Sequence, residues 1–116
     1  MAIPKVNDLT SKKCLPCEGG VPVIPPEHAA DYLKATPLWN LDDEGKAIYR
    51  KIHCKHFVDA MELLNRVAEI AESEQHHPDL HLTGYRNVRI ELTTHAIGGL
   101  SENDFILAAK VDQVVP

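Results

Sequence analysis

Three of the seven histidines lie at two neighbouring points of the chain, and they are the side chains best suited to proton transfer. His76 and His77 adjoin, and His95 follows a pair of threonines. The ordinary pKa of a histidine is about 6.5, so its neutral and charged forms coexist near neutral pH. If the fold brings His95 to the adjacent pair, the three rings can supply both an acid and a base to one substrate.

An acidic residue, Glu72, lies four positions before His76. If one helix continues through both residues, the carboxylate and the ring share a face and can form a hydrogen bond. That bond would fix the tautomer of the ring and favour its charged form. Structural roles compete with this interpretation, because histidines at the end of a helix can cap it and a glutamate is usually a solvated charge.

A metal site is the sharpest alternative, because His77 and His81 have the i, i+4 spacing of two ligands on a helix. Pro78 lies between them and prevents a helix from spanning both. Cys14 and Cys17 have the spacing of half a zinc site or of a redox pair, but only one further cysteine is present and a structural zinc needs four ligands. We therefore expect reduced thiols, with no metal and no cofactor.

The elements that must position the histidines begin after a proline-rich segment. Residues 1–26 contain five of the eight prolines and show neither helical nor strand periodicity, which predicts an extended arm. We place the boundary so that residues 1–23 form this N-terminal arm and residues 24–116 form one folded domain. Because the arm lacks apolar periodicity, we expect it to contribute little to the stability of the fold.

The first half of the domain is predicted to hold a helix and a hairpin. A short helix over residues 27–35 opens with prolines, which suit a first helical turn. Strands are predicted over 39–41 and 47–54. The acidic residues and glycine between them favour a tight turn, so the two strands should pair as a hairpin.

A long helix comes next and leads to the histidine pair. Its apolar residues recur at the spacing of one helical stripe, which predicts the face that the helix buries. Pro78 requires the helix to end at about residues 75–77. The predicted stripe consists of Phe57, Ala60, Met61, Leu64, Val67, Ala68 and Ala71.

The second half of the domain repeats the pattern of hairpin and helix. Apolar and polar residues alternate from residue 85 to 93, which is typical of a half-buried antiparallel strand, and residues 80–84 are expected to pair with it. Ser101 with Asp104 three residues later predicts a capping box that opens a helix through about Val114. In this interpretation Asp104 has a purely structural role.

The predicted fold class is therefore α+β. A single domain should contain a four-stranded antiparallel sheet with three helices packed on one face, in the order α-β-β-α-β-β-α. Unprotected strands at the edges of so small a sheet favour pairing with a second copy. We expect a symmetric homodimer whose sheet continues across the interface.

Composition limits the classes of partner. Twelve Lys and Arg against seventeen Asp and Glu give a net charge of -5, the wrong sign for binding a phosphate backbone, so we expect no direct contact with nucleic acid. The longest apolar runs are far shorter than the ~20 residues of a membrane span. The first residues lack the pattern of a secretory or organellar signal, which predicts a cytoplasmic protein.

The spacing of these residues resembles that of the pterin-4a-carbinolamine dehydratase family, also described as the dimerisation cofactor of a homeodomain transcription factor. The family pattern is an acid, three residues, His-His-Pro, five or six residues, an aromatic residue, nine residues, a histidine, and an aspartate about nine positions further on. The resemblance extends from about Asp31 to the C-terminus and leaves the arm outside the family core. One departure is Gln75, where some members carry an aspartate. The matching residues are Glu72, His76, His77, Pro78, Tyr85, His95 and Asp104.

This resemblance implies a dehydratase that removes water from 4a-hydroxytetrahydrobiopterin to give quinonoid dihydrobiopterin in tetrahydrobiopterin recycling. It implies acid-base catalysis by His76, His77 and His95, with Glu72 orienting one ring, and it implies dimers or tetramers. An alternative is a non-catalytic binding module of the same fold, acting as a transcriptional cofactor or a Rubisco assembly factor. The implied pterin-binding residues are Gln75, Thr93, Thr94, Tyr85 and Asp104.

Overall fold

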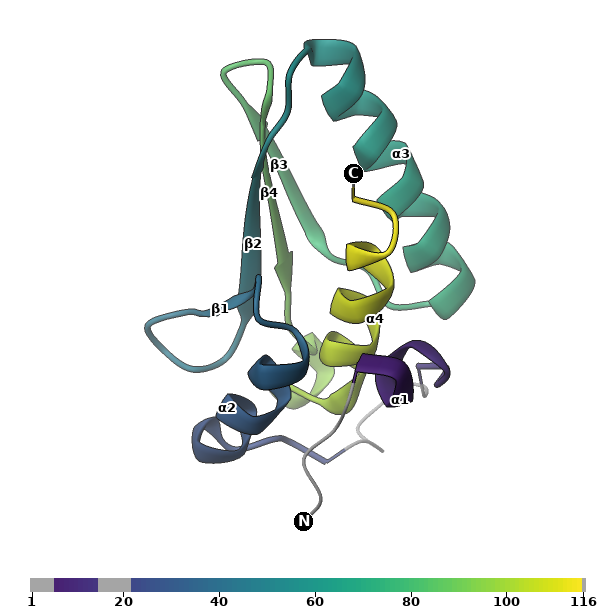
Figure 1. Cartoon of the computed structure of the whole chain (residues 1–116). Helices are drawn as coiled ribbons and strands as arrows, with labels where there is room; N and C mark the ends of the chain where they lie inside the picture. The colour runs from purple at the N-terminus through teal and green to yellow at the C-terminus, as the bar shows by residue number, and fades with distance from the viewer. Residues whose placement is uncertain (1–5, 15–21, 116) are drawn as a thin grey trace.

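An antiparallel sheet forms one layer of the protein and helices form the other (Figure 1). The computed structural model describes residues 6–14 and 22–115. Among these residues, no helix has the length and apolar character needed to cross a bilayer. The elements in chain order are α1 (Val6–Thr10), α2 (Pro26–Ala35), β1 (Asn40–Leu41), β2 (Ile48–His53), α3 (Phe57–Glu74), β3 (Asp79–Thr83), β4 (Asn87–Leu92), the 3-10 helix η1 (His95–Ile97) and α4 (Glu102–Asp112).

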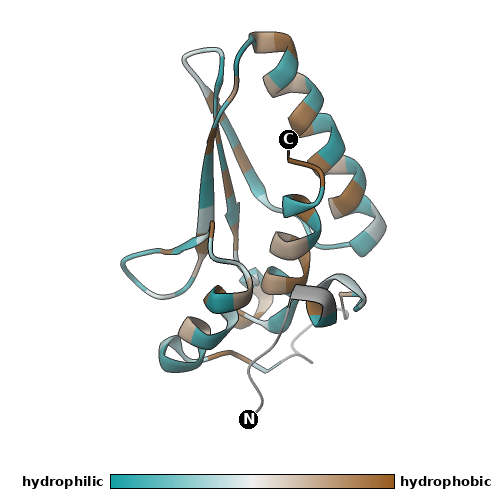
Figure 2. Ribbon diagram, in the orientation of Figure 1, coloured by the Kyte–Doolittle hydropathy of each residue, from teal (hydrophilic) through white to brown (hydrophobic). Residues whose placement is uncertain are grey.

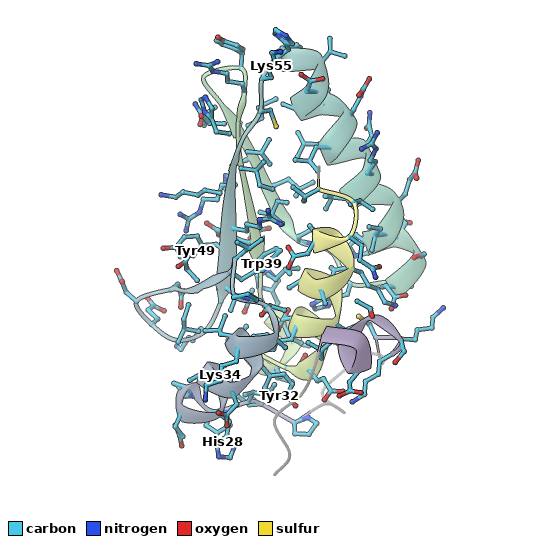
Figure 3. All side chains as sticks on the ribbon, in the orientation of Figure 1. His28, Tyr32, Lys34, Trp39, Tyr49 and Lys55 are labelled. Atoms are coloured by element: carbon cyan, nitrogen blue, oxygen red, sulfur yellow. The ribbon has the colours of Figure 1, made fainter. Side chains whose placement is uncertain are left out.

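The sheet has the strand order β1-β2-β4-β3, and all neighbouring strands are antiparallel. Both predicted hairpins are confirmed, and the pairing of β2 with β4 joins them. The alternation predicted for β4 is also confirmed, because Val88, Ile90 and Leu92 are buried. Figure 3 shows Tyr49 on the face of the sheet away from the helices and Trp39 on the face toward α4. The α+β class is thus confirmed, with one face of the sheet covered.

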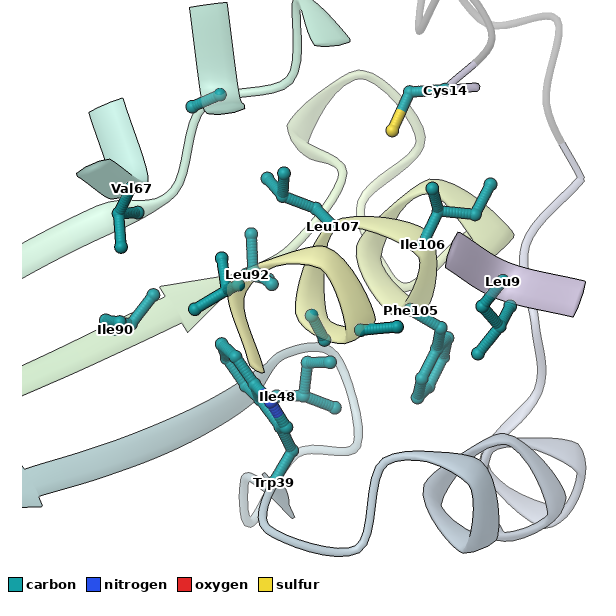
Figure 4. Close-up of a cluster of buried hydrophobic side chains, with 14 of the residues drawn as sticks. Leu9, Cys14, Trp39, Ile48, Val67, Ile90, Leu92, Phe105, Ile106 and Leu107 are labelled. Carbon is teal, nitrogen blue, oxygen red and sulfur yellow. The ribbon is translucent and has the colours of Figure 1, made fainter. Parts of the chain in front are cut away.

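Helix α4 lies at the centre of the core (Figure 4). Every residue from Asn103 to Ala109 is buried, so the helix is enclosed on all sides rather than on one stripe. Phe105 packs on Tyr32 of α2 with ring centroids 4.8 Å apart. The predicted capping box is present, since the Ser101 side chain accepts from the amide of Asp104 and the Asp104 side chain accepts from the amide of Ser101.

Helix α3 buries a narrower face than the sequence indicated. Apolar and polar residues alternate along it (Figure 2), and its buried residues are flanked by Leu64 and Ile70, which are partly buried against the core. Phe57 and Met61, both members of the predicted stripe, are 52% and 40% exposed. The stripe was wrong for these two positions, which lie on the solvent side of the buried residues. The buried residues of α3 are Ala60, Leu63, Val67, Ala71 and Glu74.

The expectation of an extended arm was wrong for the part of it that the structure describes. Residues Val6–Thr10 form a helix that packs against α4 (Figure 1). Leu9 is fully buried beside the residues of α4, and Cys14 is buried as well (Figure 4). Cys17, the second cysteine of the proposed pair, lies outside the described residues. The boundary between residues 23 and 24 stays a prediction.

Leu9→Ala is expected to lower the free energy of unfolding by about 2–5 kcal/mol, because it leaves a cavity under α1. Urea unfolding of the full chain measures this change. Leu38→Ala is the matched control, because Leu38 is 58% exposed and surface substitutions usually stay within about 0.5 kcal/mol. Equal stability of the two variants would restore the view that the arm is dispensable.

Candidate active site

Most of the predicted site residues meet at one end of the sheet. Asp79 at the start of β3 pairs with Glu91 near the end of β4. The residues before β3 and those after β4 therefore emerge at the same end of the sheet. Figure 1 shows that the connection from α3 to β3, the end of β4 and the first turn of α4 lie together there. Together with the last turn of α3, which carries Glu72, these segments and the residues directly after β4 carry all the predicted site residues except Tyr85.

The end of α3 directs the two histidines to different places. The helix stops at Glu74, and Gln75 adopts the left-handed conformation with φ 53°. The Gln75 side chain folds back and donates to the carbonyl of Glu72 at 2.6 Å, and the amide of His76 donates to the carbonyl of Ala71 at 3.2 Å. The left-handed residue reverses the chain, so His76 leaves the surface of the helix and points inward.

His76 is buried and bonded to Asp104. Its Nε2 lies 2.6 Å from Asp104 Oδ1, and the two residues are 5% and 0% exposed. Asp104 Oδ2 accepts from Thr94 Oγ1 at 2.9 Å and from the amide of Ser101 at 3.0 Å. Because a carboxylate accepts hydrogen bonds, this contact assigns the hydrogen of the ring to Nε2. Both oxygens of Asp104 are thus used to fix the position of one imidazole.

Asp104 combines two roles that the sequence presented as alternatives. It caps α4, as predicted, and it also binds His76. The hydroxyls of Thr94 and Ser101 lie 2.8 Å apart and complete the network. Ser101 was predicted only as a helix cap, and its position beside Thr94 carries no signal in the sequence. Among the described residues, no buried side-chain nitrogen or oxygen lacks a hydrogen-bond partner.

His77 forms the second carboxylate–imidazole pair, at the surface. Its Nε2 lies 2.6 Å from Glu72 Oε1, and the two side chains are 58% and 72% exposed. The predicted contact between Glu72 and His76 was therefore wrong. The left-handed conformation of Gln75 brings His77, in place of His76, to the carboxylate of Glu72. In its neutral form, a His77 ring that donates from Nε2 has Nδ1 as its acceptor. Exposed pairs of this kind add little stability.

His95 is exposed on a short loop after β4. It is the first residue of η1, and the loop is closed where the amide of Thr94 donates to the carbonyl of Gly99 at 2.9 Å. Gly98 has φ 67°, a conformation that favours glycine, and it ends the 3-10 turn. Thr93 donates from Oγ1 to the carbonyl of Lys46 at 2.5 Å. The closed loop therefore presents His95 outward at the end of the sheet where His77 lies.

Tyr85 is not brought to this cluster. It lies in the turn between β3 and β4 with φ 56°, is 58% exposed, and has Arg86 against its ring. A strand rises about 3.3 Å per residue, so the five residues of β3 separate this turn from the histidines. Its predicted contact with the pterin stays a prediction, since in one chain Tyr85 and the histidines lie at opposite ends of β3. The alternation of β4 had placed it in a strand, whereas it belongs to the turn.

Two cavities lie away from the cluster. One of about 370 Å³ opens between the end of β2 and the start of α3, and one of about 540 Å³ lies on the uncovered side of the sheet around Lys51 and Arg89. Neither is lined by His76, His77 or His95. The histidine cluster of a single chain therefore lies outside both cavities, with two exposed rings and one buried ring that is fixed on Asp104.

A helix-covered antiparallel sheet with a buried His–Asp pair and two exposed histidines at one end is suited to acid-base chemistry on a small molecule. The family model for pterin 4 alpha carbinolamine dehydratase matches residues 22–114. The chain belongs to this family, as its motif indicated.

Relatives agree with this assignment. A Halorhodospira halophila protein whose name places it among the pterin-4-alpha-carbinolamine dehydratases is 49% identical over 90% of this chain and 94% of its own. The mitochondrial pterin-4-alpha-carbinolamine dehydratase 2 of Arabidopsis thaliana is 47% identical over 92% of this chain and 59% of its own. The crystal structure of a transcriptional coactivator/pterin dehydratase from Brucella melitensis superposes with a TM-score of 0.76 at 27% identity, over 82% of this chain and all of that one.

Proposed function

We propose that the protein is a hydro-lyase that dehydrates 4a-hydroxytetrahydropterins such as 4a-hydroxytetrahydrobiopterin, in the recycling of the reduced cofactor. The hydroxyl at C4a leaves as water after protonation, the proton on N5 passes to a base, and a C=N bond forms between N5 and C4a. The observation that carries this proposal is the placement of two exposed histidines at the end of the sheet where a third is fixed by a buried carboxylate. Family membership supplies the substrate class.

The geometry suggests different roles for the three rings. His77 and His95 are exposed and can each reach a substrate placed over the end of the sheet. We assign the two proton transfers to them, with Glu72 holding the tautomer of His77 through the 2.6 Å bond. His76 is buried on Asp104, so we assign to it the binding and orientation of the pterin ring from below.

Polar groups around the rings are suited to a flat heterocycle. Thr93 and Thr94 follow β4 directly, and their backbone lies beside the histidines. The hydroxyl of Thr94 is committed to Asp104, so we assign the pterin contact of this residue to its main chain. Gln75 ends α3 next to His76 and is exposed, which places it at the rim of the same surface.

The direct test is turnover of enzymatically generated 4a-hydroxytetrahydrobiopterin by the purified chain. We expect dehydration well above the spontaneous rate, and the same rate after treatment with a chelator. Within residues 6–14 and 22–115, no group of three or more His, Cys, Asp or Glu side chains is placed to hold a metal ion. A folded protein without turnover would favour the binding module in place of the enzyme, and loss of activity with the chelator would contradict a metal-free mechanism.

We also propose that the protein is a homo-oligomer joined through the sheet. β3 is the longer of the two edge strands, and no strand among the described residues pairs with its outer side. Such an edge favours pairing with a second copy. Sedimentation equilibrium at micromolar concentration is expected to give a dimer or a multiple of it. A monomer under these conditions would contradict the proposal.

A further inference from the structure

The N-terminal segment contacts both parts of the chain that carry the buried pair of His76 and Asp104. The amide of Cys14 donates to Glu74 Oε1 at 2.8 Å, and the thiol of Cys14 lies 3.6 Å from the carbonyl oxygen of Asn103. Glu74 is two residues before His76, and Asn103 is the residue before Asp104. One residue of the N-terminal segment is thus bonded to the end of α3 and to the first turn of α4.

Glu74 is the centre of this contact, which we call the Glu74 junction (Cys14, Glu74, Asn103 and Lys110). Glu74 is only 8% exposed, and its Oε2 lies 3.1 Å from Nζ of Lys110 on α4. Burial opposes ionisation of the carboxyl, but the Cys14 amide and the Lys110 ammonium outweigh it and lower the pKa of Glu74. The ionised carboxylate of Glu74 on α3 therefore contacts both the N-terminal segment and α4 at one buried point.

The segment is anchored independently of the junction. Leu9 is fully buried against α4, and Lys12 Nζ lies 2.9 Å from Glu102 Oε1. Glu102 also accepts from the hydroxyl of Tyr32 at 3.0 Å. Cys14 is therefore held in place by its own segment, which allows it to fix the position of Glu74 rather than simply follow it.

The junction lies beside Gln75, where a small displacement of the backbone would move the His76 ring away from Asp104. His76 reaches Asp104 only because Gln75, the residue after Glu74, takes a left-handed conformation that a side chain disfavours. The 2.6 Å contact between the ring and the carboxylate joins the end of α3 to the start of α4. The Glu74–Lys110 pair and the bridging Cys14 join the same two helices from the other side of Gln75.

We propose that the Glu74 junction is a positioning element of the active site, through which the N-terminal segment keeps the His76 ring on Asp104. The expected effect of the junction on kcat rests on the proposed dehydratase activity. Its structural consequence, the geometry of the His76–Asp104 contact, can be measured without any substrate. One member of the junction, Cys14, lies before the region that resembles the family, so the arm contributes to a site that the domain alone was expected to form.

The test compares Glu74→Gln and Glu74→Ala with two controls in the full chain. Glu74→Gln keeps an oxygen for the Cys14 amide but loses the charge that faces Lys110, whereas Glu74→Ala loses both. We expect kcat to fall about tenfold in Glu74→Gln, by analogy with the ~10- to 100-fold losses seen when residues that orient metal ligands are replaced, and further in Glu74→Ala. KM should change less, because ring orientation acts mainly in the transition state.

Two controls separate positioning from simple loss of stability. Val67→Ala removes buried volume from α3 away from the junction and is expected to lower Tm while retaining kcat. Glu69→Gln removes an exposed charge from the same helix and should change neither. If Glu74→Ala lowered Tm as Val67→Ala does but retained full kcat, the junction would be structural only and the proposal would be overturned.

A second readout is independent of activity. With ¹⁵N-labelled histidine, the Nε2–H signal of His76 should be protected from solvent exchange in the natural protein and should shift and exchange faster in both Glu74 variants. In a Cys17→Ser, Cys54→Ser background, the Cys14 thiol should react slowly with a disulfide reagent and faster after Glu74→Ala. Unchanged ring signals and thiol rates would refute the junction. Absence of turnover in the natural protein, with these signals behaving as expected, would instead refute only the proposed dehydratase.

Discussion

A triple variant with His76→Ala, His77→Ala and His95→Ala is expected to convert 4a-hydroxytetrahydrobiopterin no faster than the spontaneous reaction. Positioned acid-base groups typically contribute about 10²–10⁴-fold each. Because the three rings act on one substrate, the single variants should each lose a large part of the activity and their losses should not add. Initial rates with the substrate generated in place measure this, and circular dichroism establishes that the fold is kept.

His28→Ala and His53→Ala are the controls for the triple variant. His28 is exposed on α2 (Figure 3). His53 ends β2 at the other end of the sheet, where its Nδ1 lies 2.6 Å from Asn87 Oδ1. Both variants should retain activity. Full turnover in the triple variant, or a loss in folded His53→Ala equal to that in His77→Ala, would show that the site lies elsewhere.

Asp104→Ala is expected to have the largest effect on stability among single polar substitutions. It leaves the His76 ring, the Thr94 hydroxyl and the Ser101 amide buried without their common acceptor. Leaving a buried donor without its acceptor costs about 1–3 kcal/mol, and loss of a helix cap adds about 1 kcal/mol. Chemical unfolding measures the change, and the dehydration assay should show reduced kcat wherever the variant still folds.

Asp104→Asn distinguishes the shape of this side chain from its charge. The amide keeps one oxygen for the Ser101 and Thr94 donors, so most of the cap should survive and the loss of stability should be smaller than in the alanine variant. The amide nitrogen, however, cannot accept from Nε2 of His76. We therefore expect Asp104→Asn to lower kcat about as much as Asp104→Ala does, while it lowers the free energy of unfolding less. An Asp104→Asn variant with full activity would contradict the orienting role of the carboxylate.

Local patterns predicted the elements of this fold well. Pro78 correctly indicated the end of α3, the alternation of β4 gave its buried face, and Ser101 with Asp104 gave the start of α4. Each of these signals depends on residues within a few positions of one another. The positions of the histidines at one end of the sheet followed from the same elements.

Contacts between distant residues could not be predicted in this way. The partner of His76 is 28 positions away, and the choice of Asp104 over Glu72 depends on the backbone conformation of Gln75. Glutamine gives no sequence signal for a left-handed residue, since glycine is the usual indicator. The short helix α1 was missed for a related reason, because five residues show no periodicity and its stability comes from burying Leu9 against α4.

The enclosure of α4 has a consequence for the synthesis of the protein. This helix follows all four strands in the chain, yet it supplies the centre of the core and the carboxylate that fixes His76. A nascent chain that has not yet released residues 102–112 from the ribosome would expose the apolar face of its sheet, and such surfaces are prone to aggregate. Folding and assembly of the site should therefore occur together and late, so that an incomplete chain has neither a core nor a positioned histidine.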